Sequence, residues 1–289
     1  MISLLELPAL RRELVEAGKN FDFPESPIPM VAEHTRSLRR AELYWVSRDM
    51  TQLAVATAPE MPEWTPAIAC PTPSGFMWFS APIGSTPDVP PEGFTDDGTP
   101  AEAVLGAGQI QGIHWSLHEG RTLTVTLYGG CTDESQRART RPLARGIYEI
   151  GIYQLIADVS FSPISGAIRE PWAAEMVHTL GAAWILMQQP TVATTRRTRG
   201  RGAGVGGKKK PEKTSLVQVI ELRRLAHKHS EEKGHTSREY HTRWMVRGHW
   251  RQQRVGPGRR YVRPVYVAPY IKGPEDAPLK TDRVNAWRR

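Results

Sequence analysis

The stretch Tyr240–Lys272 (YHTRWMVRGHWRQQRVGPGRRYVRPVYVAPYIK) constrains the fold more than any other part of the chain. Two runs rich in β-branched and aromatic residues flank the Gly-Pro-Gly triplet at 256–258, a strong signal for a turn between strands. With the two-residue period of a β-strand, the tryptophans fall on one face and Arg247, His249 and Arg251 on the other. The sequence therefore predicts a β-hairpin with one apolar and one cationic face.

The net charge of +8 is divided unevenly along the chain. Residues 1–189 hold 13 Lys and Arg against 22 Asp and Glu, a net charge of −9. Residues 190–289 hold 25 basic and 8 acidic residues, a net charge of +17. Such an imbalance favours a polyanionic partner for the C-terminal part, and nucleic acid is the most common one.

Several classes of protein are disfavoured by composition and by missing motifs. The two cysteines, Cys70 and Cys131, are too few for a disulfide scaffold or a cysteine-ligated zinc site, and they suit a reducing cytoplasm. The N-terminus is not typical of a signal peptide, and no apolar run is long enough to span a membrane. The sequence shows no P-loop, glycine-rich dinucleotide turn or G-x-S-x-G elbow. We therefore expect a cytoplasmic protein without a cofactor or metal site.

Residues 1–189 show a mixture of helical and strand periodicity. His114 and His118 lie four positions apart in one expected hairpin, and we interpret them as polar strand residues in preference to metal ligands or acid–base groups. The expected helices are 3–17, 34–58 and 171–189, and the expected strands are 75–83, 109–117, 121–128 and 147–161.

Beyond residue 189 the pattern changes. Thr191–Lys213 combines glycines with basic residues and has no apolar periodicity, so it is interpreted as a linker. Ser215–Arg224 alternates as a strand does, and Arg283–Trp287 is expected to form a last strand. The predicted fold class is α+β. It comprises an acidic, proline-rich N-terminal domain with hairpins and helices (1–189), a basic glycine-rich linker (190–214) and a small, basic, antiparallel β-rich C-terminal domain (215–289).

The preferred functional interpretation is nucleic-acid binding by the C-terminal hairpin through phosphate contacts. RNA or single-stranded DNA is preferred over duplex DNA, because the basic half shows no recognition helix of the helix-turn-helix type. The sequence also allows the N-terminal domain to bind a partner protein. The arginines expected to contact phosphates are Arg243, Arg247, Arg251, Arg254, Arg259, Arg260 and Arg263.

Two alternative functions remain. A metal-free ribonuclease needs a general base, a general acid and cations for the phosphate, and His249 and His241 with Arg247 and Arg251 are the candidate catalytic residues. Tyr261 or Tyr266 is a candidate additional donor in that site. The other alternative is a regulatory interaction module whose basic tail binds an acidic protein surface, including the chain's own acidic half.

The tail RWMVRGHWRQQ…PYIKGPEDAPL, together with VQVIELRR, resembles a sequence pattern of uncharacterised proteins from actinobacteria and from their phages and mobile elements. The resemblance covers the chain from about residue 215 to its last residue. It implies a bacterial or phage protein in the cytoplasm, and it transfers no catalytic residue.

Overall fold

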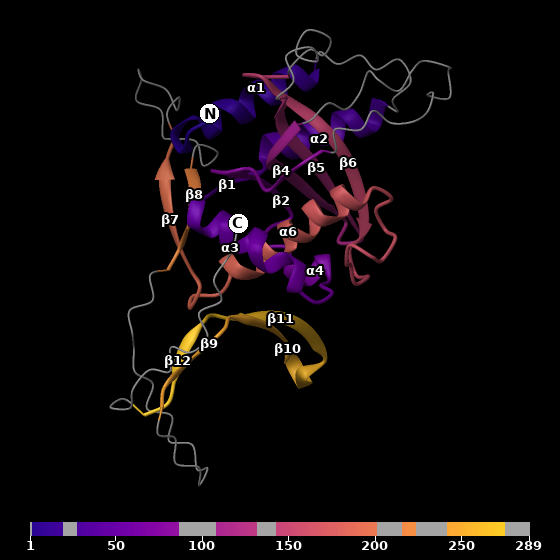
Figure 1. Ribbon diagram of the computed structural model, residues 1–289. Helices are drawn as coiled ribbons and strands as arrows, with labels where there is room; N and C mark the ends of the chain where they lie inside the picture. The colour runs from indigo at the N-terminus through magenta and orange to yellow at the C-terminus, as the bar shows by residue number, and fades with distance from the viewer. Residues whose placement is uncertain are drawn as a thin grey trace.

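An eight-stranded mixed sheet runs through the middle of the molecule in the computed structural model (Figure 1). The structure describes residues 2–19, 28–86, 108–131, 143–200, 216–223 and 242–274. The strands of the sheet are β1 (Glu42–Val46), β2 (Ser74–Phe79), β3 (Gly84–Ser85), β4 (Gly108–His118), β5 (Thr122–Cys131), β6 (Ile147–Ile156), β7 (Ala193–Arg199) and β8 (Leu216–Leu222).

The strand order is β6-β5-β4-β2-β1-β8-β7, and β3 pairs with β4. Strands β2, β1 and β8 are mutually parallel, whereas the pairs on either side of them are antiparallel. Strands β2 and β1 lie near the centre and are buried along most of their length, as expected of parallel strands that are covered on both faces, whereas β8 lies next to the edge strand β7.

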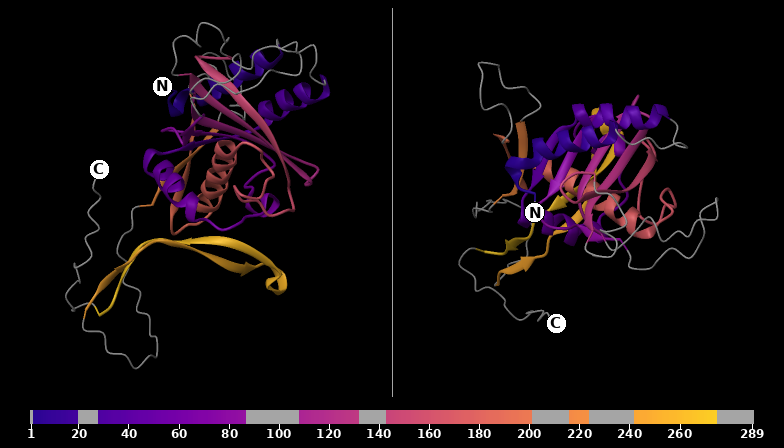
Figure 2. Two further views of the ribbon diagram at one scale, coloured as in Figure 1. Left: turned by 45° about the vertical axis from the view of Figure 1, so that its right-hand side comes forward. Right: turned by 90° about the horizontal axis from the view of Figure 1, so that it is seen from above.

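Two helices cover one face of the sheet, α1 (Leu7–Lys19) and α2 (Ile28–Arg40) (Figure 2). Their leucines pack on buried aromatic residues of the sheet. The residues of this core include Leu7, Leu10, Leu14, Leu38, Leu43, Phe76, Trp78 and Tyr128.

The other face is covered by α3 (Arg48–Thr57) and α6 (Pro171–Met187), with the short helix α4 (Pro66–Ala69) beside them. Helix α6 begins with a proline in its first turn and is apolar around most of its circumference, so it is buried on nearly all sides. The tryptophans Trp64, Trp115 and Trp184 meet edge-to-face in this core. Among the described residues, no helix is long and apolar enough to cross a bilayer.

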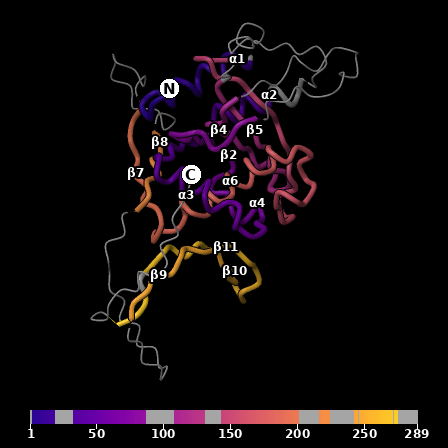
Figure 3. Tube along the Cα trace, in the orientation of Figure 1, coloured from indigo at the N-terminus to yellow at the C-terminus, as the bar shows by residue number. Residues whose placement is uncertain are grey.

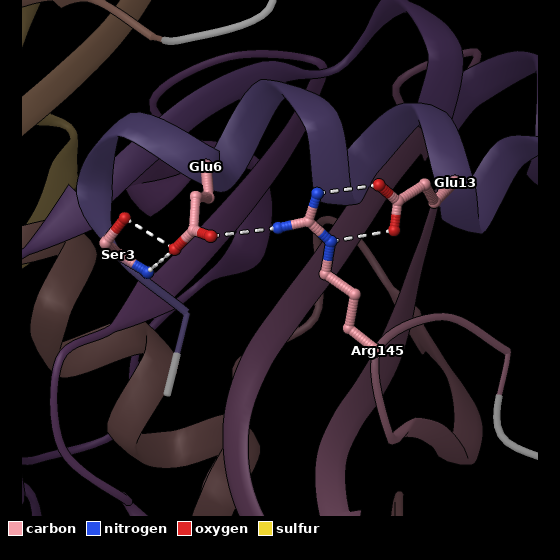
Figure 4. Close-up of polar contacts among 4 residues, drawn as sticks. All are labelled: Ser3, Glu6, Glu13 and Arg145. Carbon is pink, nitrogen blue, oxygen red and sulfur yellow. Dashed lines mark hydrogen bonds and ion pairs between the residues drawn. The ribbon is translucent and has the colours of Figure 1, made fainter.

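The N-terminus is fastened by a cluster of charged side chains (Figure 4). Arg145, in the loop before β6, donates two hydrogen bonds to Glu13 at 2.7 and 2.8 Å and one to Glu6 at 3.2 Å. Glu6 in turn accepts hydrogen bonds from the backbone N–H and the hydroxyl of Ser3, beside the short 3-10 helix η1 (Leu4–Glu6). The cluster ties the start of the chain and helix α1 to the loop before strand β6.

The C-terminal residues form two small antiparallel sheets, separate from the large one. Strand β10 (His249–Val255) pairs with β11 (Tyr261–Val267) across the 3-10 turn η5 (Pro257–Arg259). Strand β9 (Trp244–Val246) pairs with β12 (Tyr270–Lys272). The β10–β11 pair, called the ribbon below, lies against α6 on the side away from the sheet (Figures 1 and 3).

The structure confirms the α+β class, with the predicted hairpin at 109–128 and the predicted helix at 171–189. The hairpin predicted over Tyr240–Lys272 is present around its turn at 249–267, but it is not continuous, because Arg247 and Gly248 separate β10 from β9 and the outer strands β9 and β12 form a sheet of their own. The helix expected over 34–58 is wrong in its middle, because Glu42–Val46 is strand β1 between α2 and α3. Successive side chains of β1 pack into the apolar cores on the two opposite faces of the sheet. Burial on both faces outweighs the helical spacing of the apolar residues in the sequence.

Two C-terminal expectations also change. Residues Ala193–Arg199, assigned to the linker, form strand β7, and β7 pairs with β8. Strand β8 fits the strand expected at 215–224, but it pairs with β1 and β7 in the large sheet and not with the C-terminal hairpin. The remaining linker residues 201–215 and the expected strand at 283–287 lie outside the described residues.

Candidate functional site

The turn of the ribbon depends on two glycines. Gly256 and Gly258 have φ angles of 80° and 63°, in the left-handed region that favours glycine. A Cβ on Gly256 would also lie 2.7 Å from the ring of Tyr261. This turn sets a register in which Val255 lies opposite Tyr261 and His249 opposite Val267.

One face of the ribbon packs against the body. The indole Nε1 of Trp250 donates a hydrogen bond to the Thr57 carbonyl at 2.8 Å, at the end of α3. Tyr266, opposite Trp250, is 7% exposed and belongs to the core beneath α6. The amide of Gln252 donates to the Glu63 carbonyl at 3.4 Å. Apolar and neutral polar contacts therefore hold this face near Trp250, while its turn end carries Arg254 opposite Val262, and both of these side chains are exposed.

The other face of the ribbon points away from the body. Strand pairing places His249, Arg251 and Gln253 on this face, and Arg263 lies opposite Gln253. The first three side chains are exposed, and Arg251 donates a hydrogen bond to the Gln253 side-chain oxygen at 3.1 Å. The Nε of Arg263 is buried and has no hydrogen-bond partner among the described residues. We call His249, Arg251, Gln253 and Arg263 the outward row.

The end of the ribbon carries three more arginines. Arg254, Arg259 and Arg260 are exposed, and they have no ion pair among the residues that the structure describes. Residues 242–274 contain eight Lys and Arg and no Asp or Glu. Among the described residues, the exposed arginines of the ribbon and its turn therefore have no acidic partner.

The other predicted phosphate-binding residues lie elsewhere. Arg247 is in the loop before β10 and contacts Glu60, with Nη2 3.4 Å from Oε1. Arg243 is half-buried next to β9. Five of the seven predicted arginines share one element, since the ribbon or its turn carries Arg251, Arg254, Arg259, Arg260 and Arg263.

The candidate ribonuclease residues are less well assembled. His249 is exposed, and its Nδ1 lies 3.1 Å from the Arg247 carbonyl oxygen. Tyr266 is on the opposite face of the ribbon, and Tyr261 is at its far end. His241 lies outside the described residues. Within the described part of the chain, neither tyrosine joins His249 on the ribbon to form an acid–base pair.

A second polar cluster lies between α2 and the sheet. The Nε2 of His34 is 2.9 Å from the Tyr128 hydroxyl and 3.7 Å from the Glu149 carboxylate. The ring of His114, buried on β4, meets the ring of His34 edge-on at 4.9 Å. The His114 Nε2 is 3.2 Å from the Ser37 hydroxyl. Four elements therefore contribute to this cluster.

Burial shifts the protonation of this cluster. It lowers the pKa of His34 to about 4 and that of His114 well below its usual value, where the neighbouring His34 adds to the effect. It raises the pKa of Glu149 to about 7. The described residues contain no group of three or more potential metal ligands.

Sequence reasoning singled out His114 but missed His34, Tyr128 and Glu149. These residues are far apart in the chain and meet only through the pairing of β4, β5 and β6 and the packing of α2. No local motif joins them. The histidine spacing within β4 was the one available signal.

No protein-family model matches the chain, and comparison with curated proteins gives no match either. The function is therefore inferred from the geometry and charge of the chain itself. The outward face and the turn of the ribbon carry most of the predicted phosphate-binding arginines, so this surface is the candidate site.

Proposed function

We propose that this protein binds nucleic acid through the outward row and the turn arginines of the ribbon. The observation that carries the proposal is the charge of residues 242–274, which hold eight basic and no acidic residues. The exposed arginines of the ribbon within this segment have no ion pair with another described residue. Arginines of this kind bind phosphate with little competition from internal carboxylates, and phosphate contacts supply most of the affinity of such complexes.

The packing of the ribbon supports this function. Its inner face is held by Trp250 and Tyr266, so the strands are anchored without use of the outward arginines. A rigid element that presents cations to solvent loses little conformational entropy when it binds. The ion pair between Arg247 and Glu60, which joins the ribbon region to the body, is exposed on both sides and contributes little.

The experiment uses the full chain, because β8 pairs with β1 and β7 in the large sheet and a C-terminal fragment that begins before β8 would separate it from both neighbours. Fluorescence anisotropy with a labelled oligonucleotide is measured between 50 and 300 mM salt. We expect affinity to fall steeply with salt, because each phosphate contact releases counterions. The double variant R259A/R260A is expected to bind at least about tenfold more weakly and to reduce the salt slope by about two.

The matched control is R39A/R40A, which removes the same charge from exposed positions at the end of α2, across the sheet from the ribbon. If both double variants lose affinity equally, binding follows net charge alone and the ribbon is not the site. The same samples run on a denaturing gel test the ribonuclease alternative. RNA cleavage that wild type shows and H249A lacks would replace the binding proposal by that alternative.

A further inference from the structure

Two of the three aromatic side chains of the ribbon, Trp250 and Tyr266, face the body and not solvent, whereas a base-stacking surface would expose them. Trp250 and Tyr266 contact each other with ring centres 5.2 Å apart and point into the body. Within the ribbon, which the structure describes throughout, Tyr261 is the one Trp, Tyr or Phe on the outward side, 54% exposed at the turn end. Proteins that bind single strands generally stack successive bases on aromatic rings. The ribbon therefore lacks the surface that single-strand binding uses.

The outward row instead carries side chains that read the edges of paired bases. Arginine pairs bidentately with guanine and glutamine with adenine in the major groove. Arg251 and Gln253 are on one strand and Arg263 is directly opposite Gln253, so the three side chains form a compact group on one face. The hydrogen bond between Arg251 and Gln253 holds the two head groups in a defined relative orientation.

The shape of the ribbon fits the same ligand. The major groove of B-form DNA is about 12 Å wide and admits a two-stranded β-ribbon, whereas the major groove of A-form RNA is too narrow for side chains to read. Figures 1 and 2 show the ribbon arching beneath the α3 and α6 layer, with its concave side away from the body. A ribbon that follows a groove around a duplex needs this sense of curvature.

We infer that the ligand is double-stranded DNA, bound with the ribbon in its major groove. Arg251, Gln253 and Arg263 meet base edges, while the arginines at the turn end bind the flanking phosphates. This inference rests on the proposed function and reverses the preference for RNA or single-stranded DNA that the sequence alone suggested.

The first test compares ligands. Anisotropy is measured for the full chain with one sequence as duplex DNA, single-stranded DNA, single-stranded RNA and duplex RNA at 150 mM salt. Duplex DNA is expected to bind at least about tenfold more tightly than the other three. Equal or tighter binding of a single strand overturns the inference but leaves the proposed function standing, and no binding to any of the four overturns both.

The second test separates base reading from phosphate binding. A preferred duplex is selected from a random-sequence pool with the wild-type chain, and binding is repeated with each guanine replaced by 7-deazaguanine, which lacks the N7 acceptor in the major groove. At least one replacement is expected to weaken binding about tenfold. Unchanged affinity at every guanine overturns major-groove reading by the arginines.

Two adjacent glutamines supply the matched pair of variants. Gln253 is in the outward row, whereas Gln252 faces the body. Q253A leaves the charge unchanged, so its salt slope is expected to stay at the wild-type value while the base preference relaxes at one position. Q252A is expected to keep that preference. A wild-type preference in Q253A, with circular dichroism confirming that both variants fold, would remove Gln253 from the base-reading group.

Discussion

His34 and Glu149 approach each other at 3.7 Å between helix α2 and strand β6, yet burial pushes both side chains toward their neutral forms. The pKa of Glu149 rises to about 7 and that of His34 falls to about 4. At the pH where Glu149 ionises, His34 is therefore neutral and supplies no counter-charge. A carboxylate in this place destabilises the fold near and above neutral pH.

Glu149→Gln is expected to stabilise the protein at alkaline pH. Since the native state holds the Glu149 proton up to about pH 7 and the unfolded chain releases it near 4.5, wild-type stability from this group falls as pH rises through that window. The side chain is 36% exposed, so solvent screening reduces the gain to about 1–2 kcal/mol at pH 8.

Urea unfolding of wild type and E149Q at pH 5 and pH 8 measures this effect. The difference in unfolding free energy between wild type and E149Q should be small at pH 5, where the side chain at position 149 is neutral in both native proteins. It should be larger at pH 8. The His34 contribution has the opposite sign, because its lowered pKa removes stability as pH falls from 6.5 toward 4, and it is present in both proteins. An equal difference at the two pH values would show that Glu149 titrates normally.

Trp250→Ala is expected to loosen the ribbon from the body. The indole packs against the core and donates to the Thr57 carbonyl, so truncation removes buried area and leaves that carbonyl without its partner. The local cost is about 2–4 kcal/mol. Hydrogen exchange of His249–Val267 should accelerate while the large sheet stays protected. Tyr261→Ala, which truncates an exposed aromatic residue on the same ribbon, serves as the control and should change exchange little.

Gly181→Ala is expected to destabilise the α6 core. A Cβ at this position would lie 2.3 Å from the Trp64 indole. The indole cannot easily move, because its Nε1 donates to His178 at 3.1 Å. We expect a loss of about 1–3 kcal/mol in thermal or urea unfolding. Adding Trp64→Phe makes room, so the double variant should lose less than the sum of the single variants.

Arg145→Ala tests the ion pairs that join helix α1 to the loop before β6. The guanidinium binds Glu13 with bidentate geometry and also contacts Glu6, but it is partly exposed, so the expected loss is about 0.5–1 kcal/mol. The difference from wild type should shrink in 1 M NaCl, since salt screens exposed ion pairs. Arg121→Ala, at an exposed arginine with no ion pair among the described residues, is the matched control.

The features that the sequence predicted well are local ones. The Gly-Pro-Gly turn and the two-residue alternation specify the ribbon and its two faces within a short stretch, and the expected placement of Trp250 and Arg251 on opposite faces is confirmed. Helix α6 is equally local, with Pro171 at its start and Pro190 beyond its end. Such signals do not depend on the rest of the fold.

The features that escaped prediction depend on long-range packing. The apolar residues of β1 are spaced as in a helix, so the sequence pattern does not indicate a strand. The strand conformation depends on pairing with β2 and β8, which are both distant from β1 in the chain. Strand β7 resembles a basic linker because an exposed edge strand tolerates charge. The direction in which Trp250 faces could be predicted, but what it packs against could not. The meeting of His34 with Glu149 requires the complete sheet.

The position of β8 between β1 and β7 has a consequence for how the chain is made. A ribosome must synthesise the chain as far as Leu222 before the sheet can be completed. Strand β1 pairs with β2 on one side and with β8 on the other, and β8 is synthesised long after β1. During that interval one edge of the central parallel strands is unpaired, and parallel pairing at such long sequence separation is slow. We expect a chain that stops at residue 189 to aggregate, whereas one that extends through β8 acquires a charged edge strand in β7 that discourages further pairing.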